Sequence, residues 1–118
     1  MAEHAAARLG LGTAPLAGLY RPTTEAYARA TIESAWSAGI RDFDTAPLYG
    51  SGLAELRLGA ALRDRPRDQF TISTKVGRLL RPGAPDPLFP AAPALSPVFD
   101  FSRDGLRRSL EESLERLG

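Results

Sequence analysis

The sequence predicts an α/β fold, the N-terminal portion of a TIM-type (β/α)8 barrel with about three strand–helix units. Short apolar segments alternate with segments of helical periodicity along the 118 residues. Strands that alternate with helices pair in parallel through right-handed crossovers. A complete barrel takes about 250 residues. We therefore treat residues 1–118 as one incomplete barrel domain and expect the remainder of the barrel to be missing from it.

The first unit is a strand over residues 8–13 followed, after a loop rich in proline and glycine, by a helix. Thr23 or Thr24 is the expected N-cap, with Glu25 in the first turn, where the helix dipole favours a carboxylate. Gly39 is expected to end the helix. One apolar face has helical spacing and consists of Ala28, Ile32 and Ala35.

The second unit is a strand over residues 40–45 and a helix over about residues 53–63, which starts at Ser51 or Gly52. Its buried stripe contains Leu58 and Leu62, as expected for a helix that packs on a sheet.

The third predicted strand, residues 70–76, alternates strictly, so successive side chains point to opposite faces. One face is mostly apolar and consists of Phe70, Ile72, Thr74 and Val76. The other face is polar and consists of Thr71, Ser73 and Lys75. A polar set of this kind suits the barrel interior rather than the layer under the helices.

Residues 77–101 contain six prolines and little periodicity. We expect a long loop, and such loops in compact domains are usually functional or disordered. Ser102 then caps a last helix that runs to Gly118. A single stripe along this helix consists of Leu106, Leu110, Leu114 and Leu117.

A doubly wound dinucleotide-binding sheet is the main alternative to a barrel. Its first strand–helix turn should read G-x-G-x-x-G. Gly10 and Gly12 begin this pattern, but Pro15 stands at the third glycine position and has no amide to donate to a pyrophosphate. The two glycines therefore indicate a tight strand end, and the barrel is favoured.

Composition narrows the function classes. The formal net charge is +1 with both signs mixed along the chain, which gives no electrostatic basis for binding nucleic acid or an anionic membrane. The sequence shows neither the roughly 20-residue apolar run of a membrane span nor a secretory signal. We therefore expect a cytoplasmic protein that acts on a small molecule. With no cysteine, a thiolate zinc site and a thiol nucleophile are excluded, and we expect no metal.

Lys75 is the only lysine among the 15 basic side chains. In a chain that otherwise uses arginine, a single lysine indicates a position that needs an ammonium, although chance is the alternative. Asp44, Tyr49 and Lys75 each have an ordinary structural explanation, as a turn residue, a packed loop aromatic and a solvated cation. Their joint placement at the ends of adjacent strands favours catalysis.

The chemistry of these three side chains is complementary. Asp44 ends the second strand, Tyr49 follows in its loop, and Lys75 lies near the end of the third strand, where barrels carry their active groups. An ammonium beside a phenol favours the phenolate and lowers a pKa that is otherwise about 10, and a buried carboxylate holds the ammonium in place. The trio predicts a general acid/base that polarises a carbonyl during hydride transfer from a nicotinamide.

The strings FDTAPLYGSGLAELRLGAAL (residues 43–62) and FTISTKVGR (residues 70–78) resemble the aldo-keto reductase superfamily. That family consists of NAD- or NADP-dependent oxidoreductases with a catalytic tetrad of Asp, Tyr, Lys and His. The resemblance implies that Asp44 neutralises the lysine, that Tyr49 transfers the proton, and that Lys75 adjusts the acidity of Tyr49. A minor departure is Ala54-Glu55, where the family often has Ser-Glu.

The same resemblance implies contacts to the cofactor, NAD or NADP, and to a carbonyl or sugar substrate. Gly12, Thr13 and Asp44 are expected near the nicotinamide ribose. The strings STKVGRLL and FDFSRDGLRRSLEESLERLG look like the branch of aldose 1-dehydrogenases, L-fucose dehydrogenases and pyridoxal 4-dehydrogenases, whose members oxidise a lactol or hemiacetal to a lactone. Aromatic loop residues could line such a substrate or only pack on the barrel rim: Tyr20, Phe89, Phe99 and Phe101.

The resemblance also indicates what these residues do not include. The tetrad His belongs to the end of the fourth strand, and most contacts to the cofactor phosphates come from the family's C-terminal half. We therefore expect residues 1–118 alone to be inactive. Two alternatives to an enzyme stay open, a non-catalytic binding or structural subunit of this barrel type and an inactive gene fragment.

Overall fold

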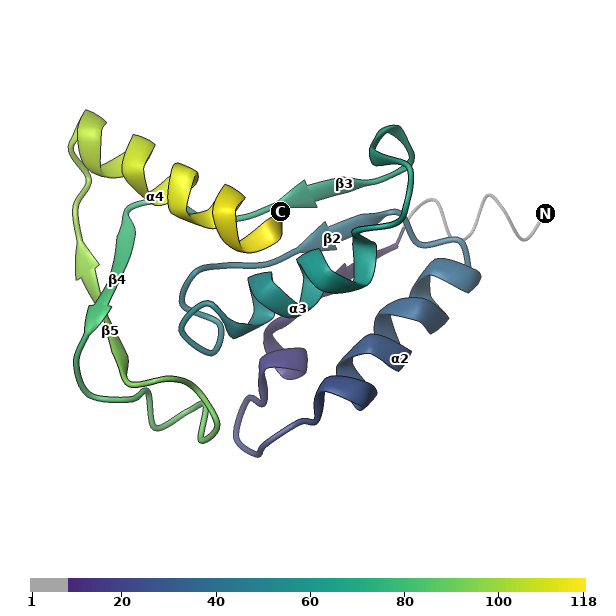
Figure 1. Ribbon diagram of the computed structural model, residues 1–118, viewed down its shortest axis with the longest axis horizontal. Helices are drawn as coiled ribbons and strands as arrows, with labels where there is room; N and C mark the ends of the chain where they lie inside the picture. Colours follow the sequence, from purple (N-terminus) through teal and green to yellow (C-terminus); the bar gives the residue numbers. More distant parts are fainter. Residues whose placement is uncertain (1–8) are drawn as a thin grey trace.

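A computed structural model describes residues 9–118 and contains a three-stranded parallel sheet (Figure 1). The strands are β1 (Gly10–Gly12), β2 (Asp42–Asp44) and β3 (Thr71–Ser73), in the order β1-β2-β3. Asp44 is paired with Gly12 on one side and with Ser73 on the other. The parallel order confirms the predicted strand–helix repeats. Each strand is shorter than its predicted range, because the ladder covers only three residues of each.

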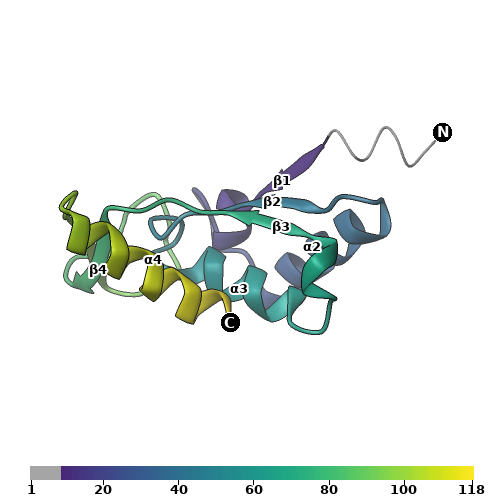
Figure 2. The same ribbon diagram turned by 90° about the horizontal axis from the view of Figure 1, so that it is seen from above.

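The helices cover one face of this sheet (Figure 2). After a 3-10 turn, η1 (Ala14–Ala17), helix α2 spans Glu25–Ser37, and α3 spans Leu53–Leu62. The Thr24 hydroxyl caps α2 by accepting from the Tyr27 amide at 3.1 Å, which decides between the two predicted caps. The main hydrophobic core lies between these helices and the sheet and consists of Leu16, Ala28, Ile32, Phe43, Leu58, Ala61, Leu62 and Phe70.

The segment predicted as a long loop contains a β-hairpin. Strands β4 (Arg78–Pro82) and β5 (Leu95–Phe99) pair antiparallel, and a short 3-10 turn, η2 (Arg67–Gln69), precedes β3. Prolines mask the strand pattern in the sequence. They are tolerated because a two-stranded ribbon consists of edge strands, where an amide facing outward needs no partner. The prediction of a long loop over residues 77–101 is therefore wrong for these two paired segments.

Helix α4 (Arg103–Leu117) is capped by Ser102, whose hydroxyl accepts from the Gly105 amide at 3.1 Å. Its buried residues are small, namely Gly105, Ser109 and Ser113. Small residues allow close packing against α3, where a Cβ on Gly59 would lie 2.3 Å from the Leu117 carbonyl oxygen.

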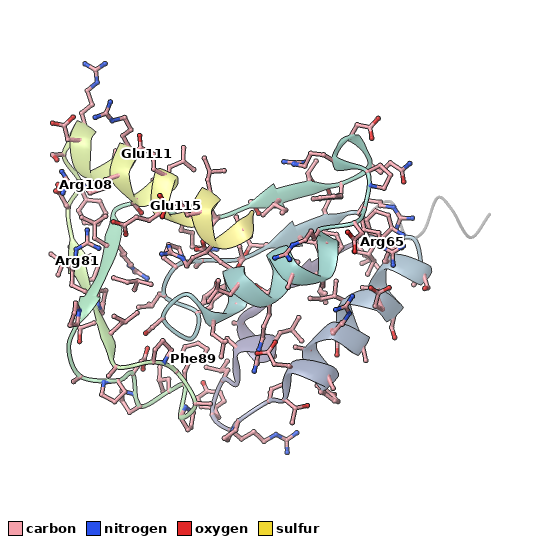
Figure 3. All side chains as sticks on the ribbon, viewed as in Figure 1. Arg65, Arg81, Phe89, Arg108, Glu111 and Glu115 are labelled. Carbon is pink, nitrogen blue, oxygen red and sulfur yellow. The ribbon has the colours of Figure 1, made fainter. Side chains whose placement is uncertain are left out.

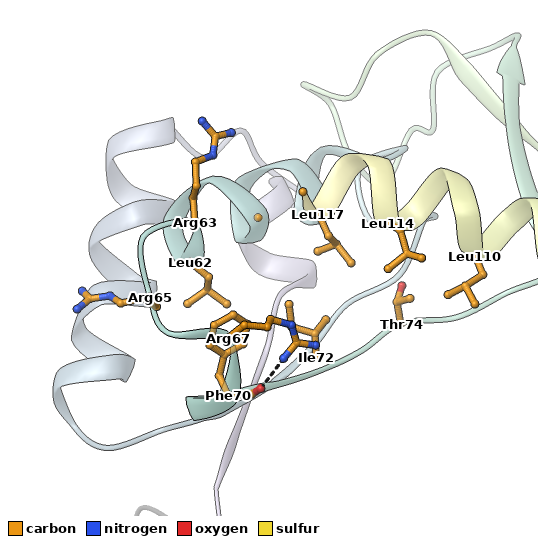
Figure 4. A pocket seen from close by; sticks show the side chains of 12 residues that line it. Leu62, Arg63, Arg65, Arg67, Phe70, Ile72, Thr74, Leu110, Leu114 and Leu117 are labelled. Atoms are coloured by element: carbon orange, nitrogen blue, oxygen red, sulfur yellow. Dashed lines mark hydrogen bonds between the residues drawn. The ribbon is translucent and has the colours of Figure 1, made fainter.

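The leucine stripe of α4 is largely exposed. Leu110 and Leu114 are 43% and 58% accessible, and with Leu117 they form one wall of a groove of about 360 Å³ whose other wall includes Phe70, Ile72 and Thr74 of the β3 segment (Figure 4). The groove lies on the helix side of the sheet, so it is separate from the polar face that carries Lys75.

Candidate active site at the carboxyl end of the strands

The face of the sheet opposite the helices carries the candidate catalytic side chains. Parallel pairing brings the ends of β2 and β3 together, with Asp44 directly opposite Ser73. Because side chains alternate along a strand, Lys75, two residues beyond Ser73, lies on the same face. The alternation predicted for the third strand is confirmed by these contacts, since Ser73 and Lys75 both reach Asp44.

Asp44 and Lys75 form a salt bridge with a Nζ–Oδ2 distance of 3.0 Å. The second carboxylate oxygen of Asp44 accepts from the Ser73 hydroxyl at 2.7 Å. The Lys75 ammonium also donates to the Thr45 carbonyl at 2.9 Å. Both partners are thus fixed by two contacts each, as expected for a pair with a geometric role.

Both charges are stabilised by their neighbours. The hydrogen bond from Ser73 lowers the pKa of Asp44 below its usual 3.8; partial burial opposes this change, and Lys75 adds to it. Burial works against the charge on Lys75. The hydrogen bond to Asp44 and the proximity of Tyr49 outweigh it and raise the pKa of Lys75 above 10.5. The pair therefore stays ionised at neutral pH.

Tyr49 lies beside this pair. It follows β2 in a turn closed by a hydrogen bond from its amide to the Ala46 carbonyl at 3.2 Å. The Lys75 ammonium lies 5.1 Å from the centroid of the Tyr49 ring. This is within the range of a cation–π contact. The structure thus brings together all three side chains of the predicted trio.

The carboxylate is not buried, contrary to the sequence-based expectation. The Asp44 and Lys75 side chains are 50% and 47% exposed. The reason lies in the sheet, because the described strands carry exposed residues at Gly12, Asp44 and Ser73 and bury only the opposite face.

Two of the predicted cofactor-binding residues differ in exposure, because Gly12 is open to solvent and Thr13 is buried. Gly12 lies next to Asp44 in the sheet, and a Cβ added to it would meet nothing within 4 Å. Thr13 is fully buried, and both its hydroxyl (2.9 Å) and its amide (3.0 Å) donate to the Asp44 carbonyl. Gly12 therefore leaves the surface beside Asp44 open, whereas the Thr13 side chain fixes the backbone of Asp44.

The four loop aromatics also divide into two groups. Phe89 is 4% exposed and packs, from the turn between β4 and β5, in a cluster with Ala17 and Ala54 that Tyr49 also contacts (Figure 3). Tyr20, Phe99 and Phe101 are 75%, 58% and 67% exposed. Phe89 thus packs against the loop of Tyr49, whereas the rings of Tyr20, Phe99 and Phe101 are exposed and accessible to a ligand.

Phe99 and Phe101 lie together after the third strand, with Phe101 against Gly77. Their ring centroids are 6.0 Å apart, and a Cβ on Gly77, two residues after Lys75, would lie 2.4 Å from the Phe101 ring. Tyr20 is held elsewhere in the first loop, where its amide donates to the Leu88 carbonyl at 2.7 Å.

Sequence reasoning missed the role of Ser73. Its hydroxyl holds the Asp44 oxygen that Lys75 does not contact. Strand alternation already placed Ser73 on the face of Lys75, but the predicted strand ranges do not give the register that pairs Ser73 with Asp44. In residues 9–118, no cluster of three metal-ligating side chains occurs. The same part of the chain contains no helix that is long and apolar enough to cross a membrane.

Comparison with known proteins shows which protein family matches the sequence of this chain. The model of the aldo/keto reductase family matches residues 8–118. The chain is 48% identical to a D-threo-aldose 1-dehydrogenase of a Pseudomonas species, with 93% of this chain and 36% of that protein covered. It is 46% identical to a pyridoxal 4-dehydrogenase of Microbacterium luteolum, again with 93% and 36% covered.

A solved structure shows the same fold. The chain matches the holo form of an aldo-keto reductase from Bacillus halodurans with a TM-score of 0.70 and 30% identity, over 92% of this chain and 31% of that one. The chain thus spans about a third of the length of these relatives. The sheet and its helices are a partial TIM barrel, as the sequence predicts.

Proposed function

The chain belongs to the aldo/keto reductase family, and from this premise we propose that it contributes the acid/base group of a hydride transfer between NAD or NADP and a small carbonyl, alcohol or lactol. The observation that carries the proposal is the salt bridge of Asp44 and Lys75 beside the Tyr49 ring. A phenol beside an ammonium that is held by a carboxylate can serve as a proton-transferring group.

Each side chain has a distinct part. The Tyr49 hydroxyl exchanges a proton with the oxygen of the reacting carbon. Lys75 supplies a positive charge beside the Tyr49 ring, and Asp44 with Ser73 holds the ammonium in place. In the oxidation direction, the substrate hydroxyl gives its proton to the phenolate as its carbon loses hydride, so the charges balance.

The nicotinamide, when bound, supplies or accepts the hydride. The open surface beside Gly12, next to Asp44, supports a place for this group here. We therefore assign the backbone of Gly12 and Thr13 and the region of Asp44 to the nicotinamide ribose, which leaves Tyr49 and Lys75 free to face the reacting oxygen.

The substrate class follows from the relatives. The proteins that share 48% and 46% identity with this chain act, by name, on a D-threo-aldose and on pyridoxal. We propose an aldose or a pyridoxal-like compound, oxidised at its lactol or hemiacetal carbon to a lactone. The exposed rings of Phe99 and Phe101 could then pack against the apolar face of a sugar or a pyridine ring.

The test is a turnover assay of the full-length protein with NAD⁺ and NADP⁺ against a panel of aldoses and pyridoxal. We expect reduction of the cofactor, lost in Lys75→Met and retained in Glu111→Gln, an exposed surface position that serves as the control. Lys75→Arg should not restore activity, because a planar guanidinium cannot replace a compact ammonium.

A non-catalytic subunit of the same family predicts a different result. Such a protein would bind the cofactor without turning over any member of the panel. Cofactor binding followed by no reduction with any substrate would therefore overturn the enzymatic proposal and favour the alternative.

A further inference from the structure

Glu55, on the first turns of α3, is a fully buried carboxylate. One of its oxygens accepts from the Thr74 hydroxyl at 3.3 Å and from the Ser113 hydroxyl at 3.1 Å. The other accepts from the Arg116 guanidinium at 3.3 Å. A charge removed from water is costly unless it is paired and hydrogen-bonded, and here three partners from two other segments satisfy it.

One partner extends this network to the loop of Tyr49. The Arg116 side chain is 17% exposed, and a Cβ on Gly52 would lie 2.9 Å from its Cδ. Gly52 has a φ of 94°, a left-handed conformation that favours glycine. The arginine stem therefore packs on the end of the Tyr49 turn while its guanidinium pairs with Glu55.

Thr74, a second partner of Glu55, lies between Ser73 and Lys75, which both contact the Asp44 carboxylate. Backbone pairing stops at its N-terminal side, where the Thr45 amide donates to the Ser73 carbonyl at 2.8 Å. It resumes where the Asp100 amide donates to the Gly77 carbonyl at 2.9 Å. In the described part of the chain, residues 74–76 make no backbone–backbone hydrogen bond, so side chains must fix this segment.

We propose that Glu55 is a positioning residue, which fixes the segment of Lys75 through its contact with Thr74. Thr74 points to the helix side and is held by Glu55, whereas Lys75 points to the opposite face and is held by Asp44. The segment is thus clamped from both sides of the sheet. The catalytic meaning of this clamp rests on the proposed function, but the effect of Glu55 on Lys75 does not.

A purely structural role of Glu55 would tie α3 to α4 and leave Lys75 unaffected. Two substitutions separate these roles, because Thr74→Val and Ser113→Ala each remove one hydroxyl donor to the same Glu55 oxygen. Only Thr74 is adjacent to Lys75. Thr74→Val also keeps the shape and strand preference of the side chain.

Lys75, the only lysine among residues 1–118, offers a direct probe. In protein grown with ¹³C- and ¹⁵N-labelled lysine, the NMR signals of the Lys75 side chain are identified by their absence from the spectrum of Lys75→Arg. A fixed side chain shows two distinct Hε resonances, and a mobile one shows a single averaged resonance. Asp44→Asn, which removes the salt bridge, is the positive control and should merge the two.

We expect Thr74→Val to merge the Hε resonances and to move the pKa of Lys75 down toward 10.5. Thr74→Ser should restore both, and Ser113→Ala should change neither. The proposal is overturned if Asp44→Asn merges the resonances while Thr74→Val does not, or if Ser113→Ala has the same effect as Thr74→Val. Thr74→Ala serves for the same comparison if the valine variant does not fold.

A second arm connects the clamp to turnover. In the full-length protein, Thr74→Val should lower kcat about tenfold to a hundredfold, as small misplacements of a catalytic group do, with cofactor affinity unchanged. Absence of turnover in the unsubstituted protein would contradict the proposed function alone, because the NMR result reports on Lys75 without any substrate.

Discussion

The two faces of the parallel sheet differ in what holds them together. On the helix side, Phe43 of β2 and Leu58 of α3 are 1% and 0% exposed and belong to one apolar core. On the other side, Asp44 and Lys75 are about half exposed and are linked by short polar contacts. Burial of apolar surface stabilises the first face, whereas the second adds little stability and carries the proposed acid/base group. Stability and activity should therefore respond to different substitutions.

The largest effect on the free energy of unfolding is expected for Leu58→Ala. Truncating a fully buried leucine leaves a cavity and should cost about 2–5 kcal/mol, measured by urea denaturation. The matched control is Leu114→Ala on α4, which is 58% exposed and should cost no more than about 0.5 kcal/mol. Similar losses at the two leucines would contradict the described packing of α3 and α4.

A smaller effect is expected from the Asp44–Lys75 salt bridge. Because both side chains are half exposed, a double-mutant cycle with Asp44→Asn and Lys75→Met should give a coupling of less than about 1 kcal/mol. The lowered pKa of Asp44 makes this contribution present above pH 3.8 and lost as the pH falls through the folded-state value.

At alkaline pH, the contribution of the salt bridge to stability depends on Lys75 and changes with pH in the opposite direction. The raised pKa of Lys75 makes the contribution present below pH 10.5 and lost as the pH rises through the folded-state value. The coupling should therefore be constant between about pH 5 and 9 and fade at both ends. A coupling that changes across neutral pH would show that another titrating group controls this pair.

The smallest effect is expected at Thr45, whose side chain is buried on the helix side. Its hydroxyl has no hydrogen-bond partner in the described part of the chain, so Thr45→Val should leave the melting temperature unchanged or raise it slightly. The carbonyl that accepts from Lys75 remains in the variant, and the lysine signal should stay the same. A loss of more than about 1 kcal/mol would indicate a hydrogen bond to this hydroxyl.

The sequence predicted the elements whose signals are local. Thr24 caps α2 and Ser102 caps α4, because a cap needs only the next three residues. Alternation alone placed Lys75 on the polar face of β3. The family resemblance is confirmed by the match over residues 8–118.

The sequence could not predict features that depend on contacts between residues distant along the chain. The hairpin of β4 and β5 is formed by pairing of two proline-containing segments, and neither has a clear strand pattern alone. The stripe of Leu110 and Leu114 is exposed because the close approach of α4 is made by Ser109 and Ser113. Glu55 resembles any helix-surface glutamate until Thr74, Ser113 and Arg116 surround it.

The most direct test of the central claim is the rate of Tyr49→Phe in the full-length protein, with cofactor affinity measured in parallel by fluorescence. The change removes the proton-transferring hydroxyl and keeps the ring that lies 5.1 Å from the Lys75 ammonium. We expect turnover to fall about 10²–10⁴-fold while the Kd for the cofactor stays the same. Near-normal turnover with an unchanged pH–rate profile would contradict the assignment of Tyr49 as the general acid/base.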